Sequence, residues 1–196
     1  MKRTLVLLFA ALAVVFPQTL PAADLQTIPE NSVYRFDAVL SDQSGNDFHL
    51  GERRGRPLLV AMFYTSCRYV CPLIIDSVKG VEHALSETER GRLGILLVSL
   101  DPARDDTAAL KSVFDKRKLD ATRWTLARTS ESNVRTLAAL LGVRYRALAD
   151  GEFNHTSALV LLDSEGRRIT SSDALGATPD AKFLAAVRNA LEIPAK

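Results

Sequence analysis

The clearest pattern in the chain is a set of three short, mostly apolar runs that lie far apart in the sequence. They cover residues 58–64 (LLVAMFY), 94–100 (GILLVSL) and 156–163 (TSALVLLD). Each run has the length of a strand, and apolar runs without polar alternation are typical of strands that are covered on both faces. The pattern therefore predicts three buried strands at the centre of one sheet.

Between these runs, apolar residues recur every three or four positions, as they do on the buried face of a helix. Gly142 directly follows one such segment, at a position where glycine commonly ends a helix. The predicted helices cover residues 72–88, 107–118, 131–141 and 179–191.

The remaining segments add shorter strands. Loose alternation over residues 33–50, with turn-forming residues at 41–47, predicts a hairpin, and residues 123–127 predict a further strand. Strands that alternate with helices build a mixed sheet with helices packed against it. The predicted fold class is therefore α/β, a thioredoxin-like fold with a mixed central sheet, helices on both faces and an N-terminal β-hairpin.

The start of the chain has the pattern of a secretory signal peptide. Lys2 and Arg3 give it a basic start, residues 5–16 form an unbroken apolar run, and Ala22 and Ala23 are small. The run is shorter than the roughly 20 residues that span a bilayer. The predicted organisation is a signal peptide at residues 1–23, an extended lead-in at 24–32 and one thioredoxin-like domain at 33–196.

This leader predicts an exported protein. The alternative is that the leader is retained and anchors the protein to the inner membrane, which would be its only contact with a membrane. The chain has 25 Lys and Arg against 23 acidic residues, and Lys2 and Arg3 lie in the leader, so the mature chain has no net charge. Nucleic-acid surfaces need clustered basic residues, so a nucleic-acid partner is not expected.

The two cysteines of the chain, Cys67 and Cys71, are separated by only three residues. Exported proteins that use disulfides as staples usually close longer loops, because closing a longer loop stabilises the fold more. On one turn of a helix the two Cα atoms would lie about 6 Å apart, which is within disulfide range. The pair is therefore predicted to be redox-active and to cycle between dithiol and disulfide.

The dithiol also lies where α/β proteins gather reactive groups. It follows a buried strand and precedes a helix, so it is expected at the carboxyl edge of the sheet. The dipole of that helix favours a thiolate, and Arg68 adds a positive charge nearby. We therefore expect the pKa of the cysteines to be lowered.

Two soft thiolates at this spacing suit Cu(I) or Zn(II), and a stable site needs a third ligand. His83 lies on the same predicted helix, about 18 Å beyond Cys71, and is excluded. His49 lies in the hairpin and remains open. His155 follows a polar loop and precedes a buried strand, so it is either a ligand or a surface or strand-capping histidine.

Three segments, in this order, resemble the signatures of the Sco/SenC family. Residues 63–72 (FYTSCRYVCP) resemble its Cys-x-x-x-Cys-Pro segment, and residues 98–105 (VSLDPARD) resemble its second motif. Residues 155–163 (HTSALVLLD) resemble the third, a histidine ahead of a strand. The resemblance extends over residues 33–190.

The resemblance implies a periplasmic or membrane-facing copper metallochaperone in which Cys67, Cys71 and His155 bind a copper ion. Members of the family aid assembly of the copper centre of cytochrome c oxidase, by delivering copper, by reducing the cysteines of the target, or both. The implied partners are an exported copper-accepting protein, namely an oxidase subunit, and a protein that reduces the dithiol. Asn154 stands where many relatives have aspartate, and the loop from Tyr145 to His155 is shorter than theirs.

Asp101 and Arg104 follow the second buried strand, at the same edge as the dithiol. They are candidates for side chains that orient the metal ligands without binding the metal themselves. The alternative is that Asp101 and Asp105 cap the next helix.

Two other functions fit the same dithiol. A thiol–disulfide oxidoreductase needs no metal, because one thiolate attacks the disulfide of a partner and the other cysteine resolves the mixed disulfide. His155 would then be dispensable. A thiol peroxidase would use one cysteine of low pKa together with peroxide. Oxidoreductase activity and copper binding are compatible, because copper requires the reduced pair.

Overall fold

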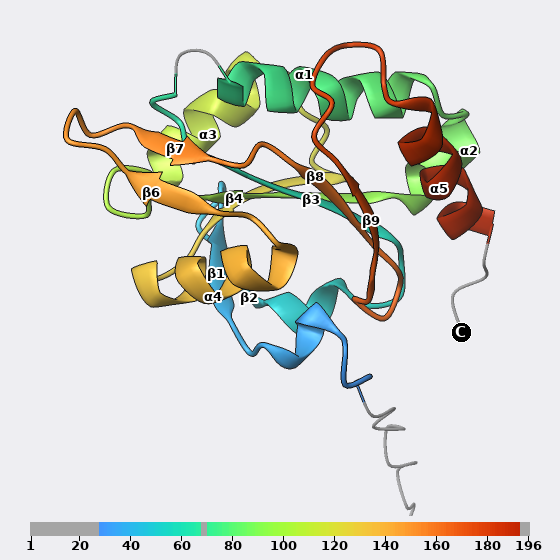
Figure 1. Cartoon of the computed structure of the whole chain (residues 1–196), viewed down its shortest axis with the longest axis horizontal. Coiled ribbons are helices and arrows are strands. Elements are labelled where there is room, and N and C mark those ends of the chain that lie inside the picture. Colours follow the sequence, from blue (N-terminus) through green and yellow to red (C-terminus); the bar gives the residue numbers. More distant parts are fainter. Residues whose placement is uncertain (1–27, 68–69, 193–196) are drawn as a thin grey trace, which may run out of the picture.

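The computed structural model of the chain describes residues 28–67 and 70–192 (Figure 1). The predicted signal peptide and Arg68 lie outside these residues. Within them, no helix is both long enough and apolar enough to cross a membrane.

A mixed sheet forms the centre of the fold. Its strands are β1 (Val39–Asp42), β2 (Asp47–His49), β3 (Leu58–Phe63), β4 (Gly94–Ser99), β5 (Trp124–Arg128), β8 (Leu159–Leu162) and β9 (Arg168–Ser172). They lie in the order β2-β1-β5-β4-β3-β8-β9. β3, β4 and β5 run parallel to one another, and each of the other pairs of neighbouring strands is antiparallel.

Helices cover the sheet on both sides. They are α1 (Val70–His83), α2 (Glu87–Arg92), α3 (Thr107–Lys116), α4 (Glu131–Leu141) and α5 (Ala181–Glu192), with two short 3-10 turns, η1 (Val33–Arg35) and η2 (Leu50–Arg53). Figure 1 shows α1 and α3 on one side of the sheet and α4 on the other. The prediction of an α/β fold with a mixed sheet and helices on both faces is confirmed.

The three apolar runs of the sequence form the buried strands, as predicted. Every residue of β3, β4 and β8 is buried, because each of these strands has a neighbouring strand on both sides and is covered on both faces. The helix predicted at residues 131–141 is α4. Ser130 caps its start by accepting a hydrogen bond from the N–H of Asn133, and Gly142 ends it with a left-handed backbone at φ 70°.

Two segments, residues 33–35 and the end of the helix predicted at 72–88, differ from the prediction. Residues 33–35 form η1 rather than a strand, because the Ser32 hydroxyl accepts the N–H of Tyr34 and begins a turn. The helix predicted to reach residue 88 ends at His83. A new helix, α2, then begins with a capping box between Ser86 and Glu89. Both differences come from side chains that hydrogen-bond to the local backbone.

The segment predicted as a loop between Tyr145 and His155 is a hairpin of two strands, β6 (Tyr145–Ala147) and β7 (Phe153–His155). This hairpin forms a separate two-stranded sheet. We call residues 145–155 the β6–β7 hairpin. The expected strand at 156–163 is shorter, since β8 begins only at Leu159.

The register of the sheet gathers the site at one edge. β8 runs antiparallel to β3, with Ala61 opposite Leu159. The residues that precede β8 therefore lie at the edge where β3 ends. β4 and β5, which are parallel to β3, end at the same edge. The loops that carry the cysteines, Asp101 and His155 thus come together at the carboxyl edge of the parallel strands.

Candidate metal centre and dithiol

The two cysteines lie between the end of β3 and the first turn of α1. Cys67 precedes α1, which begins at Val70, and Cys71 lies inside its first turn. The two cysteines therefore do not both lie within α1. The pair is nevertheless close, because the N–H of Cys71 donates to Cys67 Sγ at 3.3 Å. No disulfide joins the two sulfurs in the described structure.

Burial distinguishes the two thiols. Cys71 is 3% exposed, whereas Cys67 is only partly buried. Burial raises the pKa of the Cys71 thiol, and Cys67 and Asp105 raise it further, although the N–H of Tyr64 donates to Cys71 Sγ and acts in the opposite direction. The prediction of a lowered pKa is wrong for Cys71, because burial of the thiol is the largest effect on its pKa and raises it. Cys67 is therefore the sulfur that an external molecule reaches first.

A buried carboxylate fixes the loop ahead of the cysteines. Asp105 is fully buried, and one of its oxygens accepts the N–H of Thr65 at 3.0 Å. It also accepts hydrogen bonds from the hydroxyls of Thr65 and Ser99. Asp105 thus ties the loop after β3 to the end of β4.

Asp105 was considered in the sequence only as a helix cap, and that alternative is wrong. The residue that caps α3 is Asp106, whose side chain accepts the N–H of Ala109. The signal that marks Asp105 is an acidic residue a few positions after a buried strand, at the edge where the reactive groups gather.

Tyr64 connects the dithiol to the β6–β7 hairpin. Its hydroxyl donates to Glu152 Oε2 at 2.8 Å and accepts the N–H of Phe153 at 3.4 Å. Its ring packs edge-on against the rings of Phe153 and His155, with centroids 5.2 Å and 5.9 Å away. Since its backbone N–H also donates to Cys71 Sγ, Tyr64 contacts both the dithiol and the hairpin that carries His155.

His155 is the last residue of β7 and is half-buried. Its Nδ1 lies 3.3 Å from the carbonyl oxygen of Thr156. Burial lowers the pKa of the imidazole, and the hydrogen bond to Thr156 opposes this only in part. The neutral imidazole, which is the form that binds metals, is therefore favoured near neutral pH.

The structure brings the cysteines together but leaves His155 beside a different cavity. Cys67 and Cys71 line a cavity of about 320 Å³ between α1 and α3. His155 lines a separate cavity of about 350 Å³, with Arg144 and Arg146. Across the described residues, no three His, Cys, Asp or Glu side chains are arranged closely enough to hold a metal ion.

Asp101 and Arg104 act on the hairpin. Arg104 forms an ion pair with the buried carboxylate of Asp101 and donates a hydrogen bond to the carbonyl oxygen of Gly151. Its guanidinium also lies 5.9 Å from the ring centroid of Phe153. These contacts join the loop after β4 to the turn of the β6–β7 hairpin.

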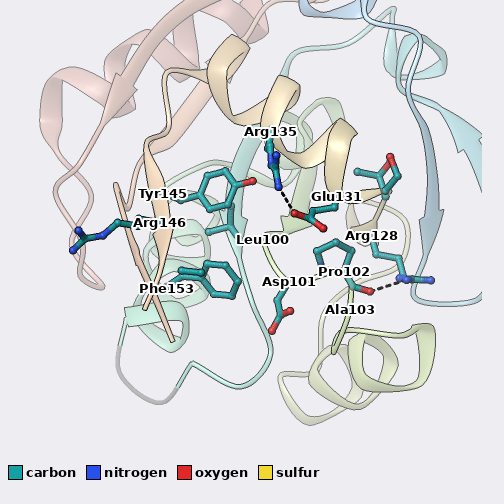
Figure 2. Close-up of a pocket in the computed structure, with 13 residues that line it drawn as sticks. Leu100, Asp101, Pro102, Ala103, Arg128, Glu131, Arg135, Tyr145, Arg146 and Phe153 are labelled. Carbon is teal, nitrogen blue, oxygen red and sulfur yellow. Dashed lines mark hydrogen bonds and ion pairs between the residues drawn. The ribbon is translucent and has the colours of Figure 1, made fainter. Parts of the chain in front are cut away.

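A larger cavity, of about 680 Å³, lies between the β6–β7 hairpin, the loop after β4 and the start of α4 (Figure 2). Figure 2 shows the rings of Tyr145 and Phe153 on one side of it and Pro102 on the other, with the ion pair of Glu131 and Arg135 above. Neither cysteine lines it, so it is distinct from the dithiol site.

The other two histidines lie away from the cysteines. His49 ends β2 at the edge of the sheet, with three strands between β2 and β3, and its Nδ1 contacts Asp37 Oδ1 at 2.6 Å. His83 is the last residue of α1, at the opposite end from Cys71. His155 is therefore the histidine that shares an edge of the fold with the dithiol.

Comparison with known proteins identifies the family to which the chain is similar. A family model described as SCO1/SenC matches residues 27–192. No curated protein sequence matches the chain significantly.

Three solved structures share the fold. A candidate electron transfer protein of Aquifex aeolicus VF5 is 24% identical, with a TM-score of 0.71 over 82% of this chain and 93% of that one. ScoI of Bradyrhizobium japonicum, solved with copper bound, is 21% identical, with a TM-score of 0.65 over 78% and 96%. BsSco, described as having a disulfide switch and as a member of the Sco family of cytochrome c oxidase assembly proteins, is 17% identical, with a TM-score of 0.67 over 81% and 96%.

The fold and the site define a thioredoxin-like α/β protein with a pair of thiols at the carboxyl edge of its sheet. Because the family model spans most of the chain, this protein belongs to the SCO1/SenC family. The family resemblance and the thioredoxin-like fold class predicted from the sequence are both confirmed.

Proposed function

We propose that this protein is an exported metallochaperone that binds a copper ion through Cys67 and Cys71 and passes it to a copper-accepting partner. The observation that carries this proposal is that two thiols lie close together at the carboxyl edge of the sheet. The N–H of Cys71 donates a hydrogen bond to Cys67 Sγ. Soft thiolates are the preferred ligands of Cu(I). The copper bound in ScoI supports the choice of metal.

His155 is proposed as the third ligand. Its lowered pKa favours a neutral imidazole, and Tyr64 holds its hairpin against the dithiol loop. No three His, Cys, Asp or Glu side chains of the described residues are close enough to hold a metal ion, so His155 and the thiols have to come closer together to complete the site. Asp101 and Arg104 are proposed to orient the metal site indirectly, by holding the turn of this hairpin.

The proposed loading step begins at Cys67, the more exposed thiol. Cys71 carries a raised pKa, so its proton leaves only when the metal replaces it, and copper binding is expected to release protons. Transfer then proceeds by ligand exchange, as the thiolates of the partner replace Cys67 and Cys71 one at a time. An oxidase subunit is the proposed acceptor, consistent with the assembly role described for the family of BsSco.

A second function, thiol–disulfide exchange, is supported by the unequal burial of the two thiols. The thiolate of Cys67 attacks a disulfide of the partner, and one sulfur of the partner leaves as a thiolate. Cys71 then attacks Cys67 Sγ and releases the other sulfur. The partner gains two electrons and two protons, and this protein becomes the disulfide. An exported thiol reductant has to return it to the dithiol. The disulfide switch described for BsSco supports this reading.

The proposed site of action is the periplasm. This rests on the basic start and the apolar run of residues 5–16, which have the pattern of a signal peptide. The thiol peroxidase alternative needs a cysteine of low pKa, and the raised pKa of Cys71 gives it no support.

Replacing His155 by alanine separates the two proposed functions. We expect the affinity for Cu(I) to fall at least about tenfold, because the site loses its imidazole donor. The rate of exchange with a peptide disulfide should stay within about twofold of wild type, because that reaction uses the sulfurs alone. Competition with a chromogenic Cu(I) chelator measures the first quantity. An unchanged copper affinity would remove His155 from the site, and His83→Ala is the control that should change neither quantity.

A further inference from the structure

The cavity beside the dithiol is a groove between α1 and α3. We call it the dithiol groove. Both cysteines line it, so a molecule in the groove lies directly against the reactive sulfurs. The remaining residues that line it are Phe63, Tyr64, Thr65, Pro72, Ile75, Val113, Lys116 and Arg117.

The floor of the dithiol groove is apolar. Phe63 and Ile75 are buried and belong to the hydrophobic core, and Val113 is partly buried on the facing side of α3. Tyr64 and Thr65 put few polar groups into it, because their hydrogen-bonding atoms bind Glu152, Phe153 and Asp105. Such a floor suits an aliphatic side chain of a partner.

The rim of the groove at the end of α3 is cationic. Lys116 is exposed, and no acidic side chain within the described part of the chain forms an ion pair with it. Arg117 forms an ion pair with Asp76, and the ammonium of Lys79 donates to the carbonyl oxygen of Arg117 at 2.5 Å. Lys116 and Arg117, the two cations that line the groove, thus have one acidic partner between them within the described residues, and the rim attracts negative charge.

We propose that the dithiol groove is the docking site of the target protein, and that it selects an acidic segment with an aliphatic residue beside the target cysteine. The inference rests on the proposed function of the dithiol and adds the chemical class of the partner. The aliphatic side chain occupies the floor formed by Phe63, Ile75 and Val113, and a flanking carboxylate meets Lys116. This arrangement brings the target sulfur to Cys67. Charge complementarity of this kind acts mainly on the rate of encounter and on the choice of partner.

The test measures the rate of disulfide exchange between the reduced protein and three matched peptides. Each peptide carries a leucine beside a cysteine, and that cysteine is held in a disulfide with a chromogenic thiol. Glutamate, glutamine or lysine flanks the leucine–cysteine pair. Cys67 attacks the peptide sulfur, the chromogenic thiolate leaves, and its absorbance reports the second-order rate constant. Cys71 then releases the peptide as a thiol.

At low ionic strength we expect the glutamate peptide to react about tenfold faster than the glutamine peptide, and the lysine peptide to react more slowly than either. Lys116→Glu should remove most of this preference. Lys116→Gln removes the positive charge without adding an acid. It should give an intermediate preference for the glutamate peptide, which tests whether the effect of Lys116→Glu comes from charge and not from a change of structure. Lys182→Glu makes the same charge change on α5, far from the groove, and should keep the preference.

The outcomes separate the groove from the chemistry of the dithiol. Equal rates for the three peptides, or an equal effect of Lys116→Glu and Lys182→Glu, would overturn the docking proposal while leaving the dithiol function intact. If none of the peptides reacts, the docking proposal and the proposed thiol–disulfide exchange both fail, and copper binding is tested separately. A concentration-dependent dimer that Lys116→Glu abolishes would assign the groove to a second copy of this chain and would also overturn the proposal.

Discussion

Replacing Asp105 by alanine is expected to destabilise the protein by about 3–5 kcal/mol. The carboxylate of Asp105 is fully buried and accepts hydrogen bonds from the N–H and the hydroxyl of Thr65 and from the hydroxyl of Ser99. Its removal leaves these donors without acceptors in the interior. The loop between β3 and Cys67 then loses its attachment to β4, so the dithiol loses its support as well.

Urea unfolding of the reduced protein, followed by circular dichroism, measures this change. Asp105→Asn keeps the shape and one acceptor oxygen, and should cost about 1–3 kcal/mol. Asp115→Ala is the matched control. Asp115 is an exposed residue of α3 that forms a surface ion pair with Lys111, and its removal should cost less than about 1 kcal/mol. A loss below about 1 kcal/mol for Asp105→Ala would show that this carboxylate does not hold the loop.

Replacing either cysteine by serine is expected to lower the affinity for Cu(I) by at least about 100-fold. The two sulfurs supply the soft donors of the proposed site, and a serine hydroxyl is a hard, neutral group that Cu(I) does not favour. The remaining thiol with His155 makes a two-ligand site at best. Because Cys67 and Cys71 contribute one thiolate each, the two variants should lose similar amounts of affinity.

The measurement is an anaerobic competition for Cu(I) between each variant and a chromogenic chelator. Ser66→Ala is the control, since Ser66 is exposed next to Cys67 and should leave the affinity unchanged. Tight binding that persists in both Cys67→Ser and Cys71→Ser would place copper elsewhere and end the proposal. Far-UV circular dichroism of each variant verifies that the fold is retained.

Most of the sheet could be predicted from the sequence, because its central strands are continuous apolar runs. The runs at β3, β4 and β8 are apolar throughout, and Gly142 marks the end of α4 by its left-handed backbone. The edges of the fold were harder to predict. η1, the break between α1 and α2, and the β6–β7 hairpin depend on local hydrogen bonds and short polar strands that apolar periodicity does not reveal.

The site was predictable in outline. The order of strands places Cys67, Asp101 and His155 at one edge, because β8 returns antiparallel beside β3. The pKa of Cys71 could not be predicted from its place at a helix N-terminus, because the burial that raises it is a property of the packed fold. The role of Asp105 was missed for the same reason, since its hydrogen bond with Thr65 joins residues that are 40 positions apart in the sequence.

The contacts of Tyr64 could not be read from the sequence either. Glu152 and His155 are distant from Tyr64 along the chain, and only the packed hairpin brings their side chains to its hydroxyl and its ring. These contacts explain how the hairpin is held beside the dithiol without His155 sharing its cavity.

The central claim is that the reduced Cys67–Cys71 pair binds copper, and a copper titration of the reduced and the oxidised protein tests it most directly. The account predicts that the reduced protein takes up one equivalent of copper tightly, with thiolate–copper absorption. The oxidised protein, in which a disulfide joins the two sulfurs, should bind none at that site. Stoichiometric binding that is equal in both forms, or absent from the reduced form, would contradict the account.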